Sequence, residues 1–211
     1  MTALSTKWTT FINHQYRYPT GLVGRVIGER MVRQHTPETA WTIDLLNLQP
    51  TDQVLELGSG AGRGLELAAQ QINRGMVTGI DLSATMVCAA LRRNRAAFRS
   101  GRLALLRGNV TAVPLVGSHF DKIFSIHTLY FWPDPAQTCR NLVRMLKPGG
   151  MLVITVATGQ LMPTGEWVYW PMHQQIEALV GALQQCDITA ADVKRGPNSR
   201  QYNNMAMVVR K

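Results

Sequence analysis

One short stretch, from Val54 to Gly64, constrains the fold more than any other part of the sequence. It reads Val-Leu-Glu-Leu-Gly-Ser-Gly-Ala-Gly-Arg-Gly, and a pattern of helical period begins at Leu65. Glycines permit backbone angles that side chains forbid, and they let a ligand lie directly against the main chain. The free N–H groups at the start of a helix favour a carboxylate or phosphate. The stretch therefore predicts a strand, a tight turn and a helix N-terminus that together bind a ligand.

A second strand strengthens this interpretation. Met76 to Ile80 is followed directly by Asp81, about 20 residues beyond the glycines, where a doubly wound fold places an acid that hydrogen-bonds ribose. A glycine turn alone suits nucleotide, dinucleotide and adenosyl ligands alike. The alternative for Asp81 is that it only caps the helix that begins near Ser83.

Three motifs together resemble those of the class I S-adenosylmethionine-dependent methyltransferases. They are Glu56–Gly62, Gly79–Asp81 and the Leu-Lys-Pro-Gly-Gly turn at Leu146–Gly150. Dehydrogenases share the glycine turn, but they lack the acid two residues before its first glycine and the later turn. The resemblance implies S-adenosyl-L-methionine as cofactor and S-adenosyl-L-homocysteine as product. It covers roughly residues 50–211.

The rest of the chain alternates between helical and strand patterns, which predicts a parallel sheet covered on both faces. The helices expected are 83–99, 135–146 and 172–185, and the strands are 103–107, 120–126, 151–157, 188–194 and 204–210. A turn-rich link joins the last two strands and predicts an antiparallel hairpin. Thr158 to Pro171 is expected to be a loop. The fold class is therefore α/β: a Rossmann-like, doubly wound sheet, mostly parallel, with a C-terminal antiparallel hairpin that resembles the seven-stranded methyltransferase sheet.

Residues 1–49 have helical patterns and are expected to form an N-terminal helical cap within the same domain as the core, residues 50–211. Thr36 followed by Pro37 predicts an N-cap and the first residue of a helix. The resemblance implies that such helices complete the substrate pocket. The wall residues implied are Tyr16, Tyr18, Arg25 and Trp41. Simple packing against the sheet is the alternative for each of them.

The cofactor site is expected where the loops after residues 57, 80, 107 and 126 converge, because open α/β sheets bind ligands beyond the carboxyl ends of their strands. The resemblance implies that Glu56 orients the ammonium group of the cofactor and that Asp81 binds its ribose. The other cofactor-binding residues implied are Gly58, Ser59, Gly60, Gly62, Leu82, Met86, Asn109, Val110 and Ile126. A turn role for Asn109 and a core role for Leu82 and Met86 are the alternatives.

Catalytic candidates lie in the segment that leaves the fourth strand. His127 stands at the strand end, where an imidazole can take a proton near neutral pH, and Tyr130 follows three residues later. A sulfonium methyl is already activated, so the protein mainly aligns the nucleophile, and a base is needed only when the nucleophile arrives protonated. Backbone bonding by His127 and turn packing by Tyr130 are the alternatives. His14 and His35 are further proton acceptors to consider.

The segment after the fourth strand also bears on the acceptor. It lacks the Asn/Asp-Pro-Pro-aromatic sequence of amino-group methyltransferases that act on adenine or glutamine. Its Pro133-Asp134-Pro135 is similar to the small-molecule group that includes the ubiquinone and menaquinone C-methyltransferases. The function expected is methyl transfer to oxygen, nitrogen or carbon of a small molecule. A non-catalytic domain that binds the cofactor or a partner protein is an alternative from another class.

The positive net charge suggests nucleic acid as a further, less favoured partner. The formal net charge is +9, and Arg92, Arg95 and Arg99 share one face of the expected helix. This arrangement suits an RNA methyltransferase, but no aromatic residues alternate with the arginines, and a solvated helix face is the simpler explanation.

The remaining composition suggests one domain in a reducing compartment. Cys88, Cys139 and Cys186 are far apart and lack metal-ligand spacing, so neither a disulfide framework nor a metal site is expected. No stretch reaches the roughly 18 apolar residues of a membrane span. Together these features predict a cytoplasmic protein without an integral membrane segment.

Overall fold

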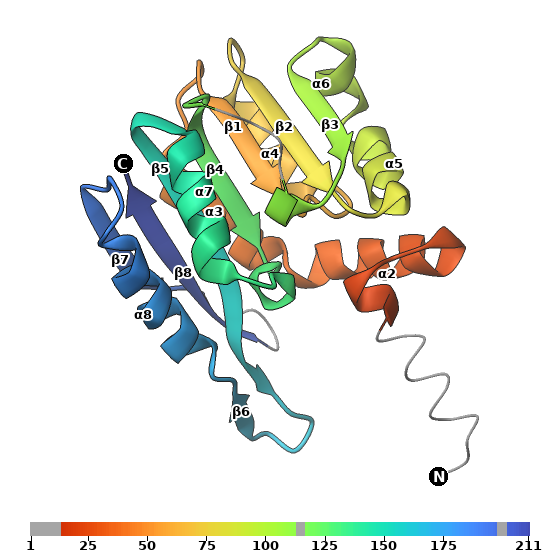
Figure 1. The fold of residues 1–211 in the computed structure, drawn as a ribbon. Coiled ribbons are helices and arrows are strands. Elements are labelled where there is room, and N and C mark those ends of the chain that lie inside the picture. The colour runs from red at the N-terminus through yellow and green to blue at the C-terminus, as the bar shows by residue number, and fades with distance from the viewer. Residues whose placement is uncertain (1–13, 113–116, 198–201) are drawn as a thin grey trace.

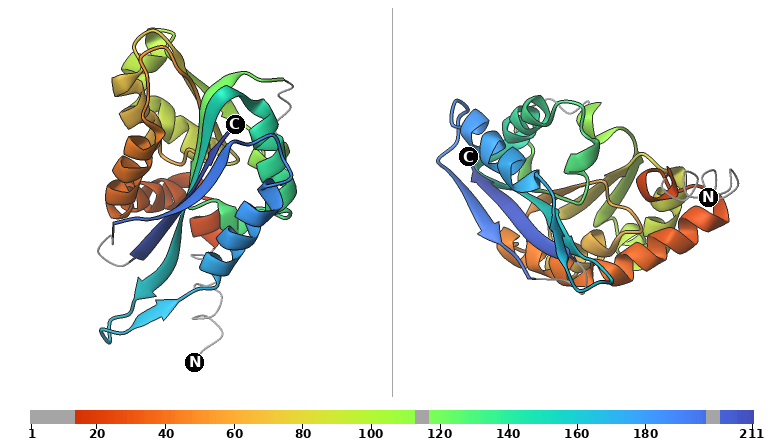
Figure 2. Two further views of the ribbon diagram at one scale, coloured as in Figure 1. Left: turned by 90° about the vertical axis from the view of Figure 1, so that its left-hand side faces the viewer. Right: turned by 90° about the horizontal axis from the view of Figure 1, so that it is seen from below.

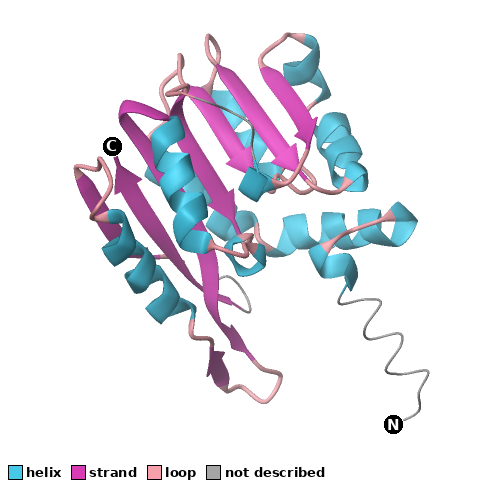
Figure 3. Ribbon diagram, in the orientation of Figure 1, coloured by secondary structure: helices cyan, strands magenta, loops and turns pink. Residues whose placement is uncertain are grey.

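A computed structural model of the chain describes residues 14–112, 117–197 and 202–211, which form a mixed α/β fold (Figures 1 and 3). Seven strands lie side by side in the order β3-β2-β1-β4-β5-β8-β7. They are β1 (Gln53–Leu57), β2 (Met76–Asp81), β3 (Leu103–Arg107), β4 (Phe120–Ile126), β5 (Leu146–Leu161), β7 (Ala190–Arg195) and β8 (Tyr202–Arg210). Neighbours among the first five pair in parallel, whereas β8 pairs antiparallel with β5 and β7. The expected sheet and its C-terminal hairpin are thereby confirmed.

Helices cover both faces of this sheet (Figure 2). They are α2 (Gly21–Gln34), α3 (Thr36–Leu46), α4 (Arg63–Gln71), α5 (Ala84–Arg93), α6 (Arg95–Arg99), α7 (Pro135–Met145) and α8 (Met172–Leu183). Successive residues of a strand point to opposite faces. Val54 accordingly packs in the core on the α3 and α4 side, whereas Leu55 and Leu57 pack in the core on the α7 and α8 side. Glu56 follows Val54 in this alternation.

Helix α2 lies across the carboxyl ends of β1, β2 and β3, below their arrowheads in Figure 1. Its contact with α5 is close, because a Cβ placed on Gly28 would lie 2.7 Å from the Cε atom of Met86. Among the described residues, no helix is both long and apolar enough to span a bilayer.

Two parts of the C-terminal half differ from expectation. Strand β5 begins at Leu146 and continues to Leu161, and a short strand β6 (Trp167–Tyr169) pairs antiparallel with its end. The expected loop over 158–171 is therefore wrong. Gly159 permits the pairing, since a Cβ there would lie 2.9 Å from the Tyr169 ring.

The expected helix over 83–99 breaks at Asn94, which ends α5 and precedes α6. The buried Asn94 side chain donates hydrogen bonds to the carbonyl oxygens of Ala90 (3.0 Å) and Gly62 (2.9 Å). Arg92 therefore belongs to a different helix from Arg95 and Arg99, and the expectation of one continuous helix that carries all three is wrong.

Other arginines near this break are used within the fold. Arg93 donates to Glu29 Oε2 at 2.6 Å and to the carbonyl of Ala61 at 2.8 Å. Arg102 donates to the carbonyls of Ala69 and Ile72. Part of the positive net charge therefore comes from arginines whose side chains make hydrogen bonds within the fold.

Candidate functional site

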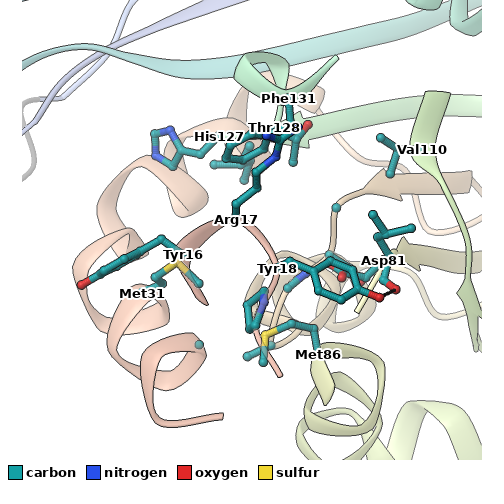
Figure 4. Close-up of a pocket in the computed structure, with 18 of the residues that line it drawn as sticks. Tyr16, Arg17, Tyr18, Met31, Asp81, Met86, Val110, His127, Thr128 and Phe131 are labelled. Atoms are coloured by element: carbon teal, nitrogen blue, oxygen red, sulfur yellow. Dashed lines mark hydrogen bonds between the residues drawn. The ribbon is translucent and has the colours of Figure 1, made fainter. Parts of the chain in front are cut away.

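A pocket of about 550 Å³ opens at the carboxyl ends of the strands, beside α2 (Figure 4). It is lined by the glycine turn, by the segments that follow β2, β3 and β4, and by residues of the N-terminal helices. Of the residues named from the sequence, it brings together Glu56, Gly58, Ser59, Gly60, Asp81, Leu82, Met86, Asn109, Val110, Ile126 and His127. Gly62 and Tyr130 are not among the lining residues.

The glycine turn has the backbone that its sequence demands. Gly58, Gly60 and Gly62 all have left-handed φ angles, of 70°, 51° and 83°, which side chains rarely adopt. The backbone N–H groups of Gly58 and Ser59 donate to the carbonyl of Ile80, at 2.8 and 3.1 Å. Gly62 is the N-cap of α4, and its carbonyl accepts the hydrogen bond from Asn94. The turn is thus fixed to β2 and to α5, with Gly62 behind the pocket surface.

Two buried polar atoms beside this turn have no hydrogen-bond partner among the described residues: Oε2 of Glu56 and Oγ of Ser59. The fourth glycine of the motif explains how the carboxylate fits, because a Cβ on Gly64 would lie 2.2 Å from Glu56 Oε1. Burial raises the pKa of Glu56 well above its usual range, and the charge of Asp81 adds to this against a hydrogen bond from the Leu65 backbone. A buried acid of this kind is suited to a cationic ligand group.

Asp81 links the turn to the next helix. Its Oδ2 accepts from the Gly60 N–H and its Oδ1 from the Ser83 N–H, both at 2.8 Å. Burial raises the pKa of Asp81 against these two hydrogen bonds. Ser83 is the N-cap of α5 and accepts from the Met86 N–H. Since a carboxylate offers about four lone pairs, Asp81 can make these contacts and still accept from a ligand hydroxyl.

The far side of the pocket is formed by residues that follow β2 and β3. Leu82 is half exposed and Met86 is buried, so they offer the pocket an open and a packed apolar surface. Asn109 Oδ1 accepts from the backbone and hydroxyl of Thr111, at 3.0 and 2.9 Å. This is the turn role considered for Asn109, and it leaves the two N–H donors of the amide outside these bonds.

The N-terminal helices supply a further wall of the pocket. Tyr16 and Tyr18 line the pocket as expected, together with Arg17 and Met31, and Figure 4 shows their side chains around it. The guanidinium of Arg17 lies 5.5 Å from the centre of the Phe131 ring, a cation–π contact across the pocket wall. No local pattern predicts this contact, because residues 17 and 131 are brought together only by the fold.

Two expected wall residues are elsewhere. Arg25 is exposed on α2, and neither it nor Trp41 lines the pocket. Trp41 packs against the core under the sheet, where its ring lies close to Gly196. Packing, the alternative weighed for Trp41, is what the structure shows.

At one end of the pocket two histidines meet a buried carboxylate. His35 Nδ1 lies 2.6 Å from Glu38 Oε1, and His127 Nε2 lies 3.2 Å from the same oxygen. The Glu38 side chain is fully buried, and its Oε2 has no hydrogen-bond partner among the described residues. Both histidines line the pocket and Glu38 does not. The histidines therefore present this cluster to a bound molecule.

The backbone explains how these residues converge. His127 has a left-handed φ of 57°, an uncommon angle for which histidine is among the better-suited residues, and its N–H donates to the carbonyl of Thr155 at 2.9 Å. His35, not Thr36, is the N-cap of α3, a correction of one residue, because the Thr36 hydroxyl instead donates to the carbonyl of Val32. Glu38 lies in the first turn of that helix.

The cluster is electrostatically coupled. Burial alone would raise the pKa of Glu38, but hydrogen bonds from His127 and His35 outweigh it and hold this pKa at about 2. Burial lowers the pKa of His127, while its hydrogen bond to Glu38 opposes that shift. The arrangement is an ionised carboxylate flanked by imidazoles.

Tyr130 lies next to His127, outside the pocket lining. Its hydroxyl accepts from the Ala157 N–H at 2.6 Å, donates to the Ala157 carbonyl at 3.1 Å, and lies 3.4 Å from His127 Nδ1. Burial raises the pKa of Tyr130. These hydrogen bonds attach Tyr130 to β5. The rings of Tyr130 and His127 stack with their centroids 6.4 Å apart.

The sequence interpretation left out Glu38 as a site residue. Its only sequence signal was the spacing of three from His35, which places both at the same end of a helix. Its contact with His127 joins residues 89 positions apart, and no local pattern specifies such a contact.

Comparisons with known proteins find similarity to methyltransferases. Residues 55–154 match a family described as a methyltransferase domain. The chain is 29% identical over 131 residues to the uncharacterized methyltransferase YdaC of Bacillus subtilis, an alignment that covers 62% of this chain and 70% of that protein. It is 26% identical over 153 residues to a demethylmenaquinone methyltransferase of Shouchella clausii, covering 72% of this chain and 65% of that protein, just under two thirds of its length.

A solved structure shows the same architecture. The structure of a SAM-dependent methyltransferase from Aquifex aeolicus superposes with a TM-score of 0.67 and 18% sequence identity, over 88% of this chain and 97% of that one. At this level of identity the likeness concerns the fold.

Proposed function

We propose that the chain, whose residues 55–154 match a methyltransferase domain, is a class I S-adenosylmethionine-dependent methyltransferase that transfers a methyl group from S-adenosylmethionine to a small-molecule acceptor. The observation that carries the proposal is the pair of buried atoms beside the glycine turn, Glu56 Oε2 and Ser59 Oγ, that have no partner among the described residues. The amino-acid end of the cofactor carries an ammonium and a carboxylate, and these two side chains can bind it. The left-handed glycines leave room for the ligand against the main chain.

The other cofactor roles follow from position in the pocket. The Asp81 carboxylate can accept from the ribose hydroxyls while it holds Gly60 and Ser83. Leu82, Met86 and Val110 offer apolar surface to the adenine, and the Asn109 amide can face its edge. Gly62 supports the turn through Asn94. Bound here, the cofactor supplies a methyl group activated by the positive charge of its sulfonium.

An acceptor would lie between that methyl group and the wall formed by the N-terminal helices. We propose that this part of the chain acts as a cap on the core, since Tyr16, Tyr18 and Met31 line the pocket. The aromatic and apolar lining suits an acceptor with an apolar or planar body. One relative is named for demethylmenaquinone, a small molecule, and this supports the acceptor class without fixing its identity.

When the acceptor arrives protonated, we assign the loss of that proton to His127. Its imidazole lies at the end of β4 on the pocket wall, and its contact with Glu38 orients the ring. A direct catalytic contact of Tyr130 stays a prediction. Its hydrogen bonds to Ala157 support a positioning role beside His127.

The test begins with the cofactor. We expect S-adenosylhomocysteine to bind in a calorimetric titration and NADH not to bind. The variant Asp81→Asn should weaken binding by about tenfold or more, because a hydrogen bond to a charged group contributes about 1.5–3 kcal/mol. Asp192→Ala is the matched control, since Asp192 is an exposed acid on β7 that pairs with Lys194. Preference for NADH, or equal effects of both variants, would contradict the proposed cofactor.

Acceptors are then screened for transfer of an isotopically labelled methyl group. Transfer to small molecules supports the proposal. Transfer to RNA would favour the alternative suggested by the net charge of +9. Tight cofactor binding without transfer to any acceptor class would favour a non-catalytic binding domain.

A further inference from the structure

His35, Glu38 and His127 form a cluster that the proposed methyl transfer only partly uses. Each residue offers one ligand atom, and the three atoms lie within 4.8 Å of one another. They come from the junction of α2 and α3, the first turn of α3 and the end of β4. We propose that these three side chains bind a divalent transition-metal ion.

The donor set suits such an ion. Two imidazole nitrogens and one carboxylate oxygen form a ligand set used by catalytic zinc sites and by non-haem iron sites, both of which keep positions open for a further ligand. No thiolate is needed, so the isolated cysteines of this chain do not bear on the proposal. The set is complete within one protein chain.

The carboxylate of Glu38 lies at the centre of the cluster and is not fully paired. Both histidines approach Oε1 of Glu38, whereas Oε2 is buried with no hydrogen-bond partner among the described residues. A buried carboxylate without full pairing is costly. A cation held by Oε1 and the two imidazoles would neutralise the charge of this buried carboxylate.

The two distances from the histidine nitrogens to Glu38 Oε1 need little change. Ligand atoms in a tetrahedral zinc site are about 3.3 Å apart, given metal–ligand bonds of about 2.0–2.1 Å. The distance from His127 Nε2 to Glu38 Oε1 is already 3.2 Å, and the distance from His35 Nδ1 to the same oxygen is 2.6 Å. The His35 contact would lengthen by less than about 1 Å to admit the ion.

The supporting contacts fix these ligands in place. The Thr39 hydroxyl donates to the carbonyl of His35 at 2.6 Å, and the hydroxyls of Thr42 and Thr155 share a buried hydrogen bond of 2.6 Å that joins α3 to β5. The Tyr130 hydroxyl lies 3.4 Å from Nδ1 of His127, the nitrogen that would not ligate. Metal-binding histidines commonly have such a partner at their second nitrogen.

The position of the cluster indicates what the ion would do. His35 and His127 both line the pocket, so an open coordination position can face a molecule bound there. An ion lowers the pKa of an oxygen bound to it. This consequence rests on the proposed function: His127 would promote loss of the acceptor's proton as a ligand of the ion. Metal binding itself requires neither cofactor nor acceptor.

The test is a titration of the chelator-treated full chain with Zn²⁺ by calorimetry, followed by the absorption spectrum with Co²⁺. We expect one Zn²⁺ per chain and a visible Co²⁺ band of low coordination number. His35→Gln and His127→Gln should each weaken Zn²⁺ binding at least about tenfold. His173→Gln is the matched control, because His173 and Glu177 form an exposed pair 3.2 Å apart on α8 that represents adventitious surface binding.

Several results would overturn the proposal: no stoichiometric Zn²⁺ in the wild type, unchanged affinity in both pocket variants, or loss of the ion in His173→Gln. Circular dichroism of each variant checks that it is folded. Titration with S-adenosylhomocysteine separates the two proposals. A chain that binds the cofactor product but no Zn²⁺ refutes only the metal site, and one that binds Zn²⁺ but not the cofactor product refutes only the proposed function.

Discussion

Glu56 couples stability to pH through one buried carboxyl group. Its pKa is raised by burial, so between the ordinary value near 4.5 and the raised one the folded chain holds a proton that the unfolded chain has lost. The free energy of unfolding should therefore fall as pH rises through this window. We expect Glu56→Gln, which cannot ionise, to lose less stability between pH 5 and pH 8 than the wild type. Denaturant unfolding at both pH values measures the free energy of unfolding. An equal change in this free energy for the wild type and Glu56→Gln would contradict the prediction.

The same carboxyl group should release a proton when a cation binds beside it. An ammonium near Glu56 favours the ionised form and lowers its pKa. The heat of S-adenosylhomocysteine binding should therefore vary with the ionisation enthalpy of the buffer at neutral pH. Glu56→Gln should bind more weakly and with less dependence on the buffer. An unchanged buffer dependence in the variant would assign the proton to another group.

At the scale of elements, Asn94 joins a helix break to the glycine turn. Asn94→Ala removes one of two donors to the buried carbonyl of Gly62, which keeps the hydrogen bond from the Glu66 N–H, and the net contribution of one hydrogen bond is about 0.5–1.5 kcal/mol. We expect that loss in the free energy of unfolding, together with weaker cofactor binding. Asn141→Ala, at an exposed position whose side chain accepts from Gln137, should change stability by less than about 0.5 kcal/mol. Similar effects of the two variants would show that the tie to the turn is unimportant.

Local patterns determined the elements that the sequence predicted well. Strands β3 and β4 begin and end at the residues expected, because apolar runs bounded by turns mark them. The break at Asn94 was missed, since its cause is a tertiary hydrogen bond to Gly62. Strand β6 was missed for a similar reason, because its three residues depend on pairing with the end of β5.

The site follows the same division. Asp81 was predicted because it directly follows a strand, where topology brings loops together, and Glu56 was predicted from the family resemblance of the glycine motif. Arg17 and Glu38 were not placed in the site, because they reach Phe131 and His127 only through packing of α2 and α3 on the sheet. The sequence thus predicted the pocket residues at the strand ends better than those from the N-terminal helices.

At the scale of the whole molecule, the N-terminal helices have two separable tasks. Helix α3 is part of the core: Ile43 and Leu46 are 2% and 0% exposed, within the same cluster as Val54 and Phe124. Helix α2 buries only Gly24, Ile27 and Gly28, and its Met31 lines the pocket. Helix α3 should therefore matter more for stability, and helix α2 should matter more for binding.

Two truncated chains test this division. A chain of residues 50–211 lacks α3 and exposes apolar surface on β1 and β4, so we expect it to lose cooperative unfolding. A chain of residues 34–211 keeps α3 and should unfold cooperatively, but it should bind S-adenosylhomocysteine at least about tenfold more weakly, because Tyr16, Tyr18 and Met31 are gone. Thermal unfolding and calorimetry measure both effects. Full stability of 50–211 would make the N-terminal region dispensable for folding, and unchanged affinity of 34–211 would remove α2 from the binding site.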